Sequence, residues 1–312
     1  MLVLGIAVVI WGFSFSLAKI SLLTFDPFEL VTLRLLLGSI AGLFLSIGIT
    51  KWAPSVANSA QVNISRGGFF SKDQWRQALV IGVFEFAGTY LLYTWSLKFL
   101  PSGVIGTLTL MTPVLTYIVG TVAGIDKLRL KAGFALALSL IGGALCLPLA
   151  AIFNNFHLEN QALWGTGLIL ASNLCFAIGN VAITHLEMRR KWNNALTFHG
   201  QFIGFILAGT VLVFNEGFPK LEMSKFKIQN WILPLYLGLV ATGLGFFLWN
   251  WGVQKVSATK ATLVGNLKGP ISVLIGCVLL QEHVSLELFV GLVLLFISII
   301  ILPREKRLQC SN

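Results

Sequence analysis

The sequence predicts an all-α polytopic membrane protein, in which ten transmembrane helices form two inverted five-helix repeats around a central cavity. The first supporting observation is compositional. The chain has 312 residues, of which 56% are hydrophobic and only 11% are charged, and its mean hydropathy is +0.85. Soluble proteins average about 25% charged residues, so this chain has too little charge to cover a surface exposed to water. Composition therefore excludes an ordinary soluble enzyme, and four cysteines without a CxxC pair do not make a disulfide scaffold.

The second observation is a series of ten apolar stretches, each close to the ~20 residues that a helix needs to cross the hydrocarbon core. They span about residues 2–22, 28–49, 78–99, 102–123, 130–152, 163–185, 195–214, 231–252, 259–281 and 285–302. Because lipid offers the backbone no hydrogen-bond partner, each stretch is expected to be a helix. The first stretch has no basic segment before it, so it is interpreted as a retained span and not as a signal peptide.

The positions of the basic residues predict how these helices are oriented. Fourteen of the 22 Lys and Arg residues fall in the connections after the even-numbered stretches and in the C-terminal segment: Lys51, Arg66, Lys72, Arg76, Lys127, Arg129, Lys131, Arg189, Arg190, Lys191, Lys255, Arg304, Lys306 and Arg307. The opposite connections hold Lys98, Lys220, Lys225 and Lys227. Because basic loops stay on the cytoplasmic side, both termini are expected in the cytoplasm of a cell (plasma or inner) membrane. The net charge of +10 is then a topology signal, and no nucleic-acid partner is predicted.

The third observation is an internal repeat. An offset of 165 residues pairs Trp11 with Phe176 and Arg34 with His199, and an offset of 156 pairs Trp95 with Trp251. Each half contains five apolar stretches, and since five is odd, the second half must enter the membrane from the opposite side. Inverted repeats are typical of secondary transporters, in which two similar halves exchange conformations around a central site.

The repeat also predicts the domain organisation. The first five-helix repeat is expected over residues 1–152, and the second, with a short basic C-terminal tail, over residues 153–312. The longest connection, about residues 50–77, is polar and rich in Ser, Asn and Gly. It is expected to be a cytoplasmic linker.

Short motifs along nearly the whole chain resemble EamA-type members of the drug/metabolite transporter superfamily. They are Trp11-Gly12-Phe13-Ser14-Phe15 with Lys19, Asp26-Pro27-Phe28 with Leu33-Arg34-Leu35, Trp95-Ser96-Leu97 with Pro101-Ser102, Pro113, and Gln281-Glu282-His283 with Gly291. The sequence departs from the family pattern at Asp126, where Glu is usual, and at Lys260 and Lys268, where apolar or small residues are usual. The resemblance implies ten helices in two inverted repeats, a central cavity and secondary transport of metabolites, often as export of amino acids.

Three charged residues lie deep in the apolar stretches, where an unpaired charge costs several kcal/mol. Glu85 is the one acid well inside a stretch, and its repeat counterpart is Ala241. The sequence predicts a cargo-binding or proton-coupling carboxylate there, and the alternative is a structural ion pair with Lys268 or Arg34.

Lys268 lies in Gly265-Asn266-Leu267-Lys268-Gly269-Pro270, where Gly and Pro loosen the helix and free backbone groups. Its ammonium group is predicted to meet a carboxylate or phosphate in the cavity. The guanidinium fork of Arg34 suits a substrate carboxylate. In the resembled family this arginine is common to members with unlike cargo, which favours a structural role.

Polar and aromatic side chains are predicted to complete the substrate-binding site. Besides Lys268, Glu85 and Arg34, the candidates are Trp11, Ser14, Tyr90, Asn180, Asn250 and Asn266. Each could instead pack or hydrogen-bond between helices. No spacing of His, Cys or acidic residues indicates a metal site, and no cofactor is predicted.

These features predict a secondary-active transporter of small metabolites that works by alternating access. Cations outnumber acids inside the stretches, which favours amino acids or related zwitterionic or anionic cargo. Phosphorylated sugars or nucleotide-linked compounds are the alternative. An ATP-driven pump is not supported, because the chain has no Gly-Lys pair for a phosphate loop. An intramembrane transferase would need clustered acids and histidines, which the sequence lacks, so no enzymatic activity is predicted.

Overall fold

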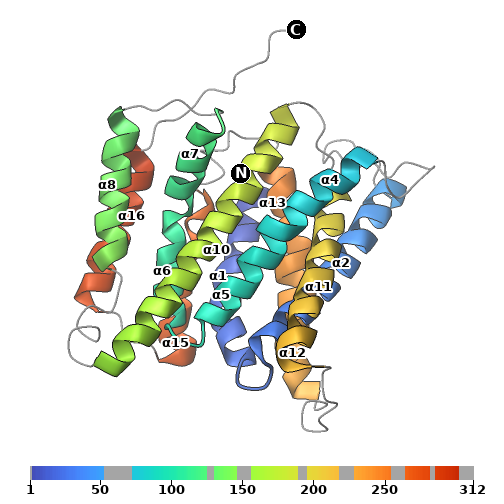
Figure 1. Cartoon of the computed structure of the whole chain (residues 1–312), viewed down its shortest axis with the longest axis horizontal. Helices are drawn as coiled ribbons and strands as arrows, with labels where there is room; N and C mark the ends of the chain where they lie inside the picture. The colour runs from blue at the N-terminus through green and yellow to red at the C-terminus, as the bar shows by residue number, and fades with distance from the viewer. Residues whose placement is uncertain are drawn as a thin grey trace.

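The computed structural model describes residues 2–52, 72–124, 130–145, 156–188, 195–217, 228–253, 264–281 and 285–301, and all regular structure within them is helical. The elements are α1 (Leu2–Ser21), α2 (Pro27–Trp52), α4 (Lys72–Ile81), η1 (Gly82–Gly88), α5 (Thr89–Ser96), α6 (Ser102–Leu108), η2 (Thr109–Met111), α7 (Thr112–Val122), α8 (Leu130–Leu145), α10 (Phe156–Met188), α11 (Ala195–Glu216), α12 (Ile228–Leu235), η4 (Tyr236–Leu244), α13 (Gly245–Val253), α15 (Lys268–Leu280) and α16 (Leu286–Ile301). Figure 1 shows them as one bundle.

The described helices account for all ten predicted stretches. Seven helical segments in this part of the chain are long and apolar enough to cross a membrane: α1, α2, α4–η1–α5, α6–η2–α7, α10, α11 and α12–η4–α13. The shorter apolar helices α8, α15 and α16 occupy the other three stretches. The predicted all-α polytopic fold is therefore confirmed.

The ends of two helices follow directly from local sequence. Asp26 precedes Pro27, whose fixed φ suits the first helical position, and the Asp26 amide donates to the Glu29 carboxylate at 3.2 Å, as in a capping box. The Ser285 hydroxyl accepts the Leu288 amide at 3.1 Å and so starts α16.

The predicted linker 50–77 is partly wrong at its edges. Helix α2 continues to Trp52 and α4 begins at Lys72, so both flanking helices extend into the predicted linker. Polar residues can continue a helix beyond the hydrocarbon core into the interfacial region, where an apolar pattern no longer marks it. Residues 53–71 lie outside the described residues, as does the predicted boundary between residues 152 and 153. The division into two domains therefore stays a prediction.

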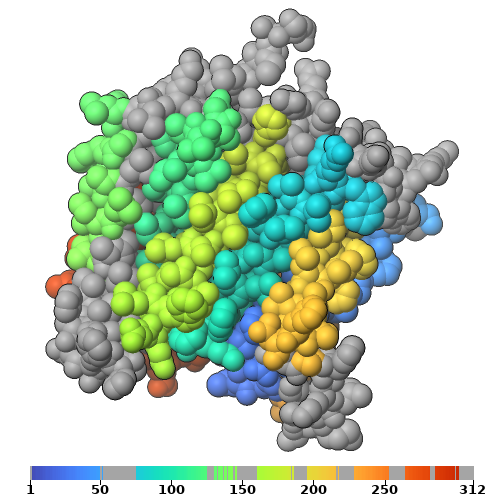
Figure 2. Space-filling view, viewed as in Figure 1, coloured from blue at the N-terminus to red at the C-terminus, as the bar shows by residue number. Residues whose placement is uncertain are grey.

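The helices pack as expected for an inverted repeat. Repeat-equivalent spans pack against each other: α2 packs against α11, α8 packs against α16, and the span α6–η2–α7 packs through α6 against α15. Helix α1 packs against η4, α13 and α15, and its counterpart α10 packs against η1, α5 and α7, which are the equivalent elements of the first half. In Figure 1, α1 and α10 run in opposite directions, as do α2 and α11. Figure 2 shows α10, α4–α5 and α11 side by side across one face.

The two halves are also broken at equivalent positions. The wide, π-helical segments η1 and η4 overlap under the 156-residue offset, which maps Gly82–Gly88 onto residues 238–244. A second pair of breaks lies at η2, just before Pro113, and at residues 266–267, just before Pro270. Proline lacks the amide that would continue the preceding turn, so these breaks follow from the sequence. Both kinds of break free backbone groups near the middle of the bundle.

Close packing at the α6–α15 contact requires a glycine. A Cβ atom on Gly106 would lie 2.6 Å from the Cβ of Ser272, so only glycine allows these two broken helices to approach. The Ser272 hydroxyl donates to the Ser102 carbonyl across the same contact, at 3.3 Å. This contact holds the two proline-containing breaks next to each other.

Candidate functional site

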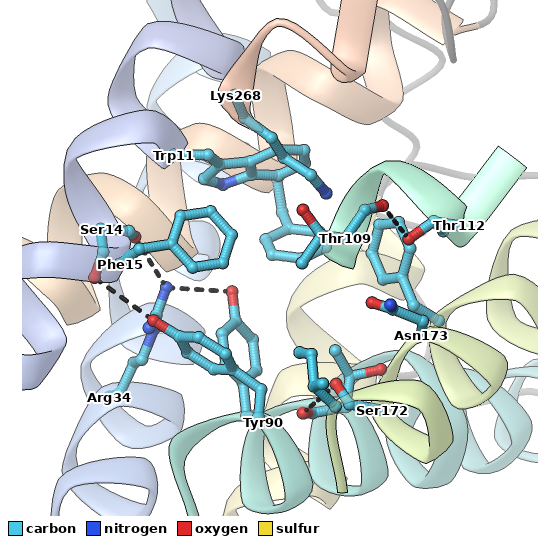
Figure 3. Close-up of a pocket in the computed structure, with 15 residues that line it drawn as sticks. Trp11, Ser14, Phe15, Arg34, Tyr90, Thr109, Thr112, Ser172, Asn173 and Lys268 are labelled. Atoms are coloured by element: carbon cyan, nitrogen blue, oxygen red, sulfur yellow. Dashed lines mark hydrogen bonds between the residues drawn. The ribbon is translucent and has the colours of Figure 1, made fainter. Parts of the chain in front are cut away.

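A pocket with an empty volume of about 550 Å³ lies where the broken helices meet. Eight elements line it, from both halves of the chain (Figure 3). The lining residues are Trp11, Ser14 and Phe15 of α1; Arg34 of α2; Thr89, Tyr90 and Tyr93 of α5; Thr109 of η2; Thr112 of α7; Ile169, Ser172, Asn173 and Phe176 of α10; Phe246 of α13; and Lys268 of α15. A pocket shared by both repeats is what the predicted central cavity requires.

The lining combines aromatic rings with positive charge. Six of the 15 lining side chains are aromatic, two (Arg34 and Lys268) are cationic, and none is acidic. Aromatic faces attract cations and also accept apolar bodies. Because both cations belong to the protein, the pocket is electrically complementary to an anion.

Arg34 is held in place by three hydrogen bonds from two of its nitrogens. Its Nε donates to the Thr242 hydroxyl at 2.7 Å, and its Nη2 donates to Ser14 Oγ and Tyr90 Oη, each at 3.2 Å. The guanidinium carbon also lies 4.1 Å from the centroid of the Tyr90 ring. The remaining nitrogen, Nη1, is buried and has no hydrogen-bond partner in the part of the chain that the structure describes. Arg34 is therefore a fixed cation with unused donors beside the pocket.

Thr242, whose hydroxyl accepts the hydrogen bond from Arg34 Nε, is held in place by other residues of the second half. Thr242 lies in η4, where its hydroxyl donates to the Leu237 carbonyl at 2.8 Å. The Gln201 side chain donates to the Thr242 carbonyl at 3.0 Å. Helices α2, α11 and η4 are thus joined behind the arginine, which explains why a single guanidinium can be buried there.

Lys268 lies on another side of the pocket from Arg34 (Figure 3). Its Nζ is 5.2 Å from the centroid of the Phe176 ring and 5.8 Å from that of Trp11, within the range of a cation–π contact. None of the described carboxylates forms an ion pair with it. Lys268 is the first residue of α15, and its repeat counterpart Thr112 is the first residue of α7. Both half-helix N-termini, which carry partial positive charge, therefore border the pocket.

Two polar side chains of α10 donate hydrogen bonds to backbone carbonyls near the helix breaks. The Asn173 amide donates to the Leu108 carbonyl at 3.0 Å, next to η2. The Ser172 hydroxyl donates to the Thr89 carbonyl at 2.8 Å, just after η1. Satisfying these carbonyls lets irregular helix persist at membrane depth.

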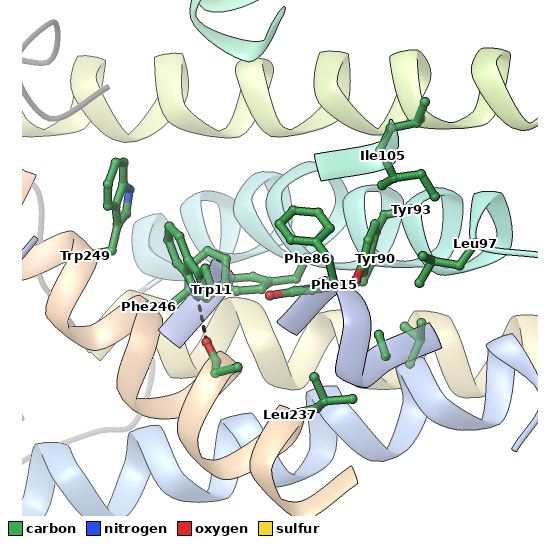
Figure 4. Packing of buried hydrophobic residues seen from close by; sticks show 14 of the residues in the cluster. Trp11, Phe15, Phe86, Tyr90, Tyr93, Leu97, Ile105, Leu237, Phe246 and Trp249 are labelled. Atoms are coloured by element: carbon green, nitrogen blue, oxygen red, sulfur yellow. Dashed lines mark hydrogen bonds between the residues drawn. The ribbon is translucent and has the colours of Figure 1, made fainter. Parts of the chain in front are cut away.

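The aromatic side of the pocket continues into the core (Figure 4). The Trp11 ring lies 4.8 Å from Phe246 and 5.1 Å from Trp249, and its Nε1 donates to the Ala241 carbonyl at 2.9 Å. Trp249 is 5% exposed, so it belongs to the core and not to an interfacial belt of tryptophans. This packing fixes the orientation of Trp11 at the pocket wall.

The structure brings five of the nine predicted site residues together around the pocket: Trp11, Ser14, Arg34, Tyr90 and Lys268. The other four lie elsewhere. Asn180 donates to the Phe176 carbonyl of its own helix at 2.9 Å, and Asn250 donates to Thr197 of α11 at 2.8 Å. Asn266 is buried at the break before α15 but does not line the pocket, and Glu85 is buried within η1.

Some lining residues were not predicted as part of the site. Thr89, Thr109, Thr112, Ile169, Ser172 and Phe246 belong to this group. The repeat carried a usable signal for Thr112, because the 156-residue offset pairs it with Lys268. Ile169 and Phe246 carry no such signal, since apolar residues on apolar helices face lipid, core or cavity equally well.

Known proteins resemble this chain over most of its length. The model of the EamA-like transporter family matches residues 1–147 and 163–303. The biotin transporter of Escherichia coli strain K12 is 24% identical over 205 residues, which span 66% of this chain and 66% of that protein. The uncharacterized transporter YoaV of Bacillus subtilis strain 168 is 22% identical over 92% of this chain and 90% of its own length. A protein of known crystal structure aligns with a TM-score of 0.64 over 96% of this chain and 94% of its own, at 17% identity, which shows a shared fold.

The family match spans both halves of the chain and so includes every helix that lines the pocket. Its members and the named relatives are transporters and not enzymes. The Escherichia coli relative is named for biotin, which is a small molecule. This chain belongs to the EamA-like transporter family and is a multi-pass membrane transporter of small molecules.

Proposed function

We propose that this protein carries small organic carboxylates across the cell membrane by alternating access. The observation that carries the proposal is a pocket with two cations, Arg34 and Lys268, and no acidic lining residue among those described. The cargo carboxylate would bind the unused Nη1 of Arg34 and the Lys268 ammonium, while its apolar body lies against the aromatic rings. The paired repeats support alternating access, because the α1–η4 and α10–η1 contacts are equivalent and can exchange roles.

The lining favours an anion over a zwitterion. An amino acid would bring an ammonium group into a pocket that already holds two cations, and like charges in a poorly hydrated site repel strongly. Biotin, for which the Escherichia coli relative is named, is a monocarboxylate with an apolar chain and ring system. It is therefore the first probe for this protein.

Amino-acid export is the second candidate. Thr109, Thr112, Ser172 and Asn173 place hydroxyl and amide oxygens at the pocket wall, and such acceptors could bind an α-ammonium group. Comparing cargo with and without each charged group separates the two candidates.

The test is a thermal-shift measurement on the purified protein, followed by counterflow in proteoliposomes. Biotin is expected to raise the melting temperature and to exchange across the vesicle membrane, whereas biotin amide, which lacks the carboxylate, should do neither. Leucine, as the zwitterionic probe, is expected to have no effect. Stabilisation by leucine but not by biotin would favour the second candidate, and equal stabilisation by biotin and its amide would contradict a carboxylate site.

Lys268→Ala is expected to abolish transport without changing protein level. Losing one partner of a buried charge pair costs about 2–5 kcal/mol, so the affinity for biotin should fall at least ~30-fold. Lys268→Arg should retain part of the affinity. The matched control is Lys98→Ala, which removes an exposed cation that pairs with Asp26 at 3.5 Å, far from the pocket lining. Normal flux in Lys268→Ala would remove this residue from the binding site.

A further inference from the structure

We propose that Glu85 is a proton-binding site separate from the pocket, and that its proton moves together with the anionic cargo. The proton-binding part stands on the structure of η1 alone. The coupling part rests on the proposed function, because it needs a negatively charged cargo. The two parts are therefore tested by separate measurements.

Glu85 lies in the middle of η1 with 0% of its surface exposed. Neither carboxyl oxygen has a hydrogen-bond partner among the described residues, and the alternative ion pair with Arg34 or Lys268 is not formed. A buried carboxylate without partners is strongly disfavoured, whereas a protonated carboxyl group is neutral and far less costly to bury. The surroundings of Glu85 therefore accommodate the protonated group.

No charged group on the neighbouring elements changes this conclusion. Helices α4, α5, α10 and α11 pack against η1. The titratable or charged side chains that the structure describes on them are Arg76, Tyr90, Tyr93, Cys175, His185 and His199. None of them is within hydrogen-bond or ion-pair distance of the Glu85 oxygens. Of these side chains, Tyr90 also contacts a pocket cation, because its hydroxyl accepts from Arg34 Nη2 at 3.2 Å.

The missing partners also identify the ligand as a proton and not a metal cation. A sodium or calcium ion needs several oxygen ligands around it, but no hydroxyl or other hydrogen-bond donor of the described chain reaches the carboxyl oxygens of Glu85. Among the described residues, no three or more His, Cys, Asp or Glu side chains are grouped so that they could hold a metal ion. A proton needs only one oxygen.

The contact that seals Glu85 is the one expected to open during transport. Helix α10 lies directly against η1 because residue 179 is glycine: a Cβ there would lie 2.7 Å from the Cβ of Glu85. This contact joins the two repeats and is equivalent to the α1–η4 contact, where the counterpart Ala241 accepts a hydrogen bond from Trp11. Only one of the two equivalent contacts therefore carries an acid. When α10 and η1 separate, water can reach Glu85 and the proton can leave, so the two conformations differ in proton affinity.

The position of Tyr90 gives the direction of coupling. Tyr90 lines the pocket, accepts a hydrogen bond from Arg34 at 3.2 Å, and lies five residues after Glu85 on the same helical span. An anion bound beside Arg34 would repel a second negative charge at Glu85 and so favour its protonated form. By linkage, the proton favours binding of the anion to the same extent. Anion and proton are therefore expected to cross together, which leaves no net charge on the pair.

Infrared difference spectroscopy of the purified protein tests proton binding without any cargo. The spectrum should contain the C=O band of a protonated carboxyl group in dry surroundings, and Glu85→Gln should remove that band. Glu85→Asp should shift the band instead, which guards against a folding defect in the glutamine variant. Glu287→Gln, which changes an exposed acid at the start of α16, should leave it intact. A spectrum in which Glu85→Gln keeps the band would overturn the proposal.

Proteoliposomes test the coupling with radiolabelled biotin as the probe. An inward proton gradient should drive wild-type accumulation above the equilibrium level, whereas Glu85→Gln should lose accumulation but retain biotin counterflow. Glu287→Gln should accumulate biotin like wild type. Accumulation by Glu85→Gln with unchanged pH dependence would overturn the coupling, as would accumulation driven by a sodium gradient. If biotin is not transported at all, the proposed cargo fails while the infrared result still decides the proton site.

Discussion

The hydrogen bonds of Arg34 allow its positioning to be tested at a residue that does not line the pocket. Thr242→Val keeps the side-chain shape but removes the hydroxyl that accepts Arg34 Nε at 2.7 Å. A buried donor left without an acceptor costs about 1–3 kcal/mol. We expect a lower melting temperature in detergent and a smaller stabilisation by biotin, because the guanidinium is no longer fixed beside the pocket.

Thr210→Val is the matched control for this prediction. Thr210 lies on exposed α11 surface, and its hydroxyl donates only to the Ile206 carbonyl of its own helix, at 2.8 Å. Its melting temperature should stay close to that of wild type. Equal melting temperatures for both variants would mean that the Thr242 hydroxyl does not hold Arg34.

The candidate site shows which residues can be predicted from sequence and which cannot. Arg34 and Lys268 stand out because a charge in an apolar stretch needs a specific environment. Asn173 and Asn180 are seven residues apart, which places them on the same face of α10, but only Asn173 lines the pocket. Whether a residue of α10 lines the pocket depends on its position along the helix relative to the pocket. That position is set by how α10 packs against η2 and α5. Local sequence does not contain that information.

The α6–α15 contact makes a prediction about whole elements. Gly106→Ala would place a methyl group 2.5 Å from Ser272 Oγ and 2.6 Å from its Cβ, so the two helices must separate. Overpacking of this kind costs about 1–3 kcal/mol. We expect a lower melting temperature and weaker binding of biotin, because η2, α7 and α15 all contribute to the pocket wall.

A double mutant separates this steric effect from a general intolerance of substitution. Ser272→Gly removes the atoms that collide with the new methyl group, so adding it to Gly106→Ala should recover part of the lost stability. Gly5→Ala should be tolerated, since nothing lies within 4 Å of a Cβ at that position. A double mutant no more stable than the sum of the two single effects would show that the close approach is not the cause.

The two kinds of helix break differ in how far sequence predicts them. Pro113 and Pro270 mark the breaks at η2 and before α15, because proline cannot continue the preceding hydrogen-bond ladder. The segments η1 and η4 contain no proline, and their sequences are compatible with ordinary α-helix. Their widening is stabilised by tertiary packing, as where Gly179 lets α10 approach Glu85. That cause is visible only once the helices are placed.

At the scale of the whole molecule, two offsets read from the sequence anticipated the arrangement of the halves. They pair α2 with α11, the span α6–η2–α7 with the span that ends in α15, and α8 with α16, and the two members of each pair are in contact. Sequence similarity alone does not say that equivalent helices touch. That follows from an axis of pseudo-symmetry in the membrane plane, which brings equivalent elements together where they cross it. The contacts α1–η4 and α10–η1 are two copies of one contact, and both lie away from that axis. The two copies can therefore differ in sequence, as they do at Ala241 and Glu85.

The orientation of the molecule is the last prediction, and it follows from charge at the two ends of the bundle. Lys51, Arg76 and Lys131 lie at the ends of α2, α4 and α8 that share one side of the bundle, and Leu23 and Lys98 lie at the other. Because basic residues are retained in the cytoplasm, a membrane-impermeant maleimide should label Leu23→Cys and Lys98→Cys on intact cells. It should label Lys51→Cys and Arg76→Cys only after the membrane is permeabilised. The background for all four variants replaces the native cysteines 146, 175, 277 and 310 with serine, and a variant without any cysteine gives the blank. Labelling with the opposite sidedness would place the basic ends outside the cell. The whole bundle, including the α10–η1 contact that buries Glu85, would then have the opposite orientation in the membrane.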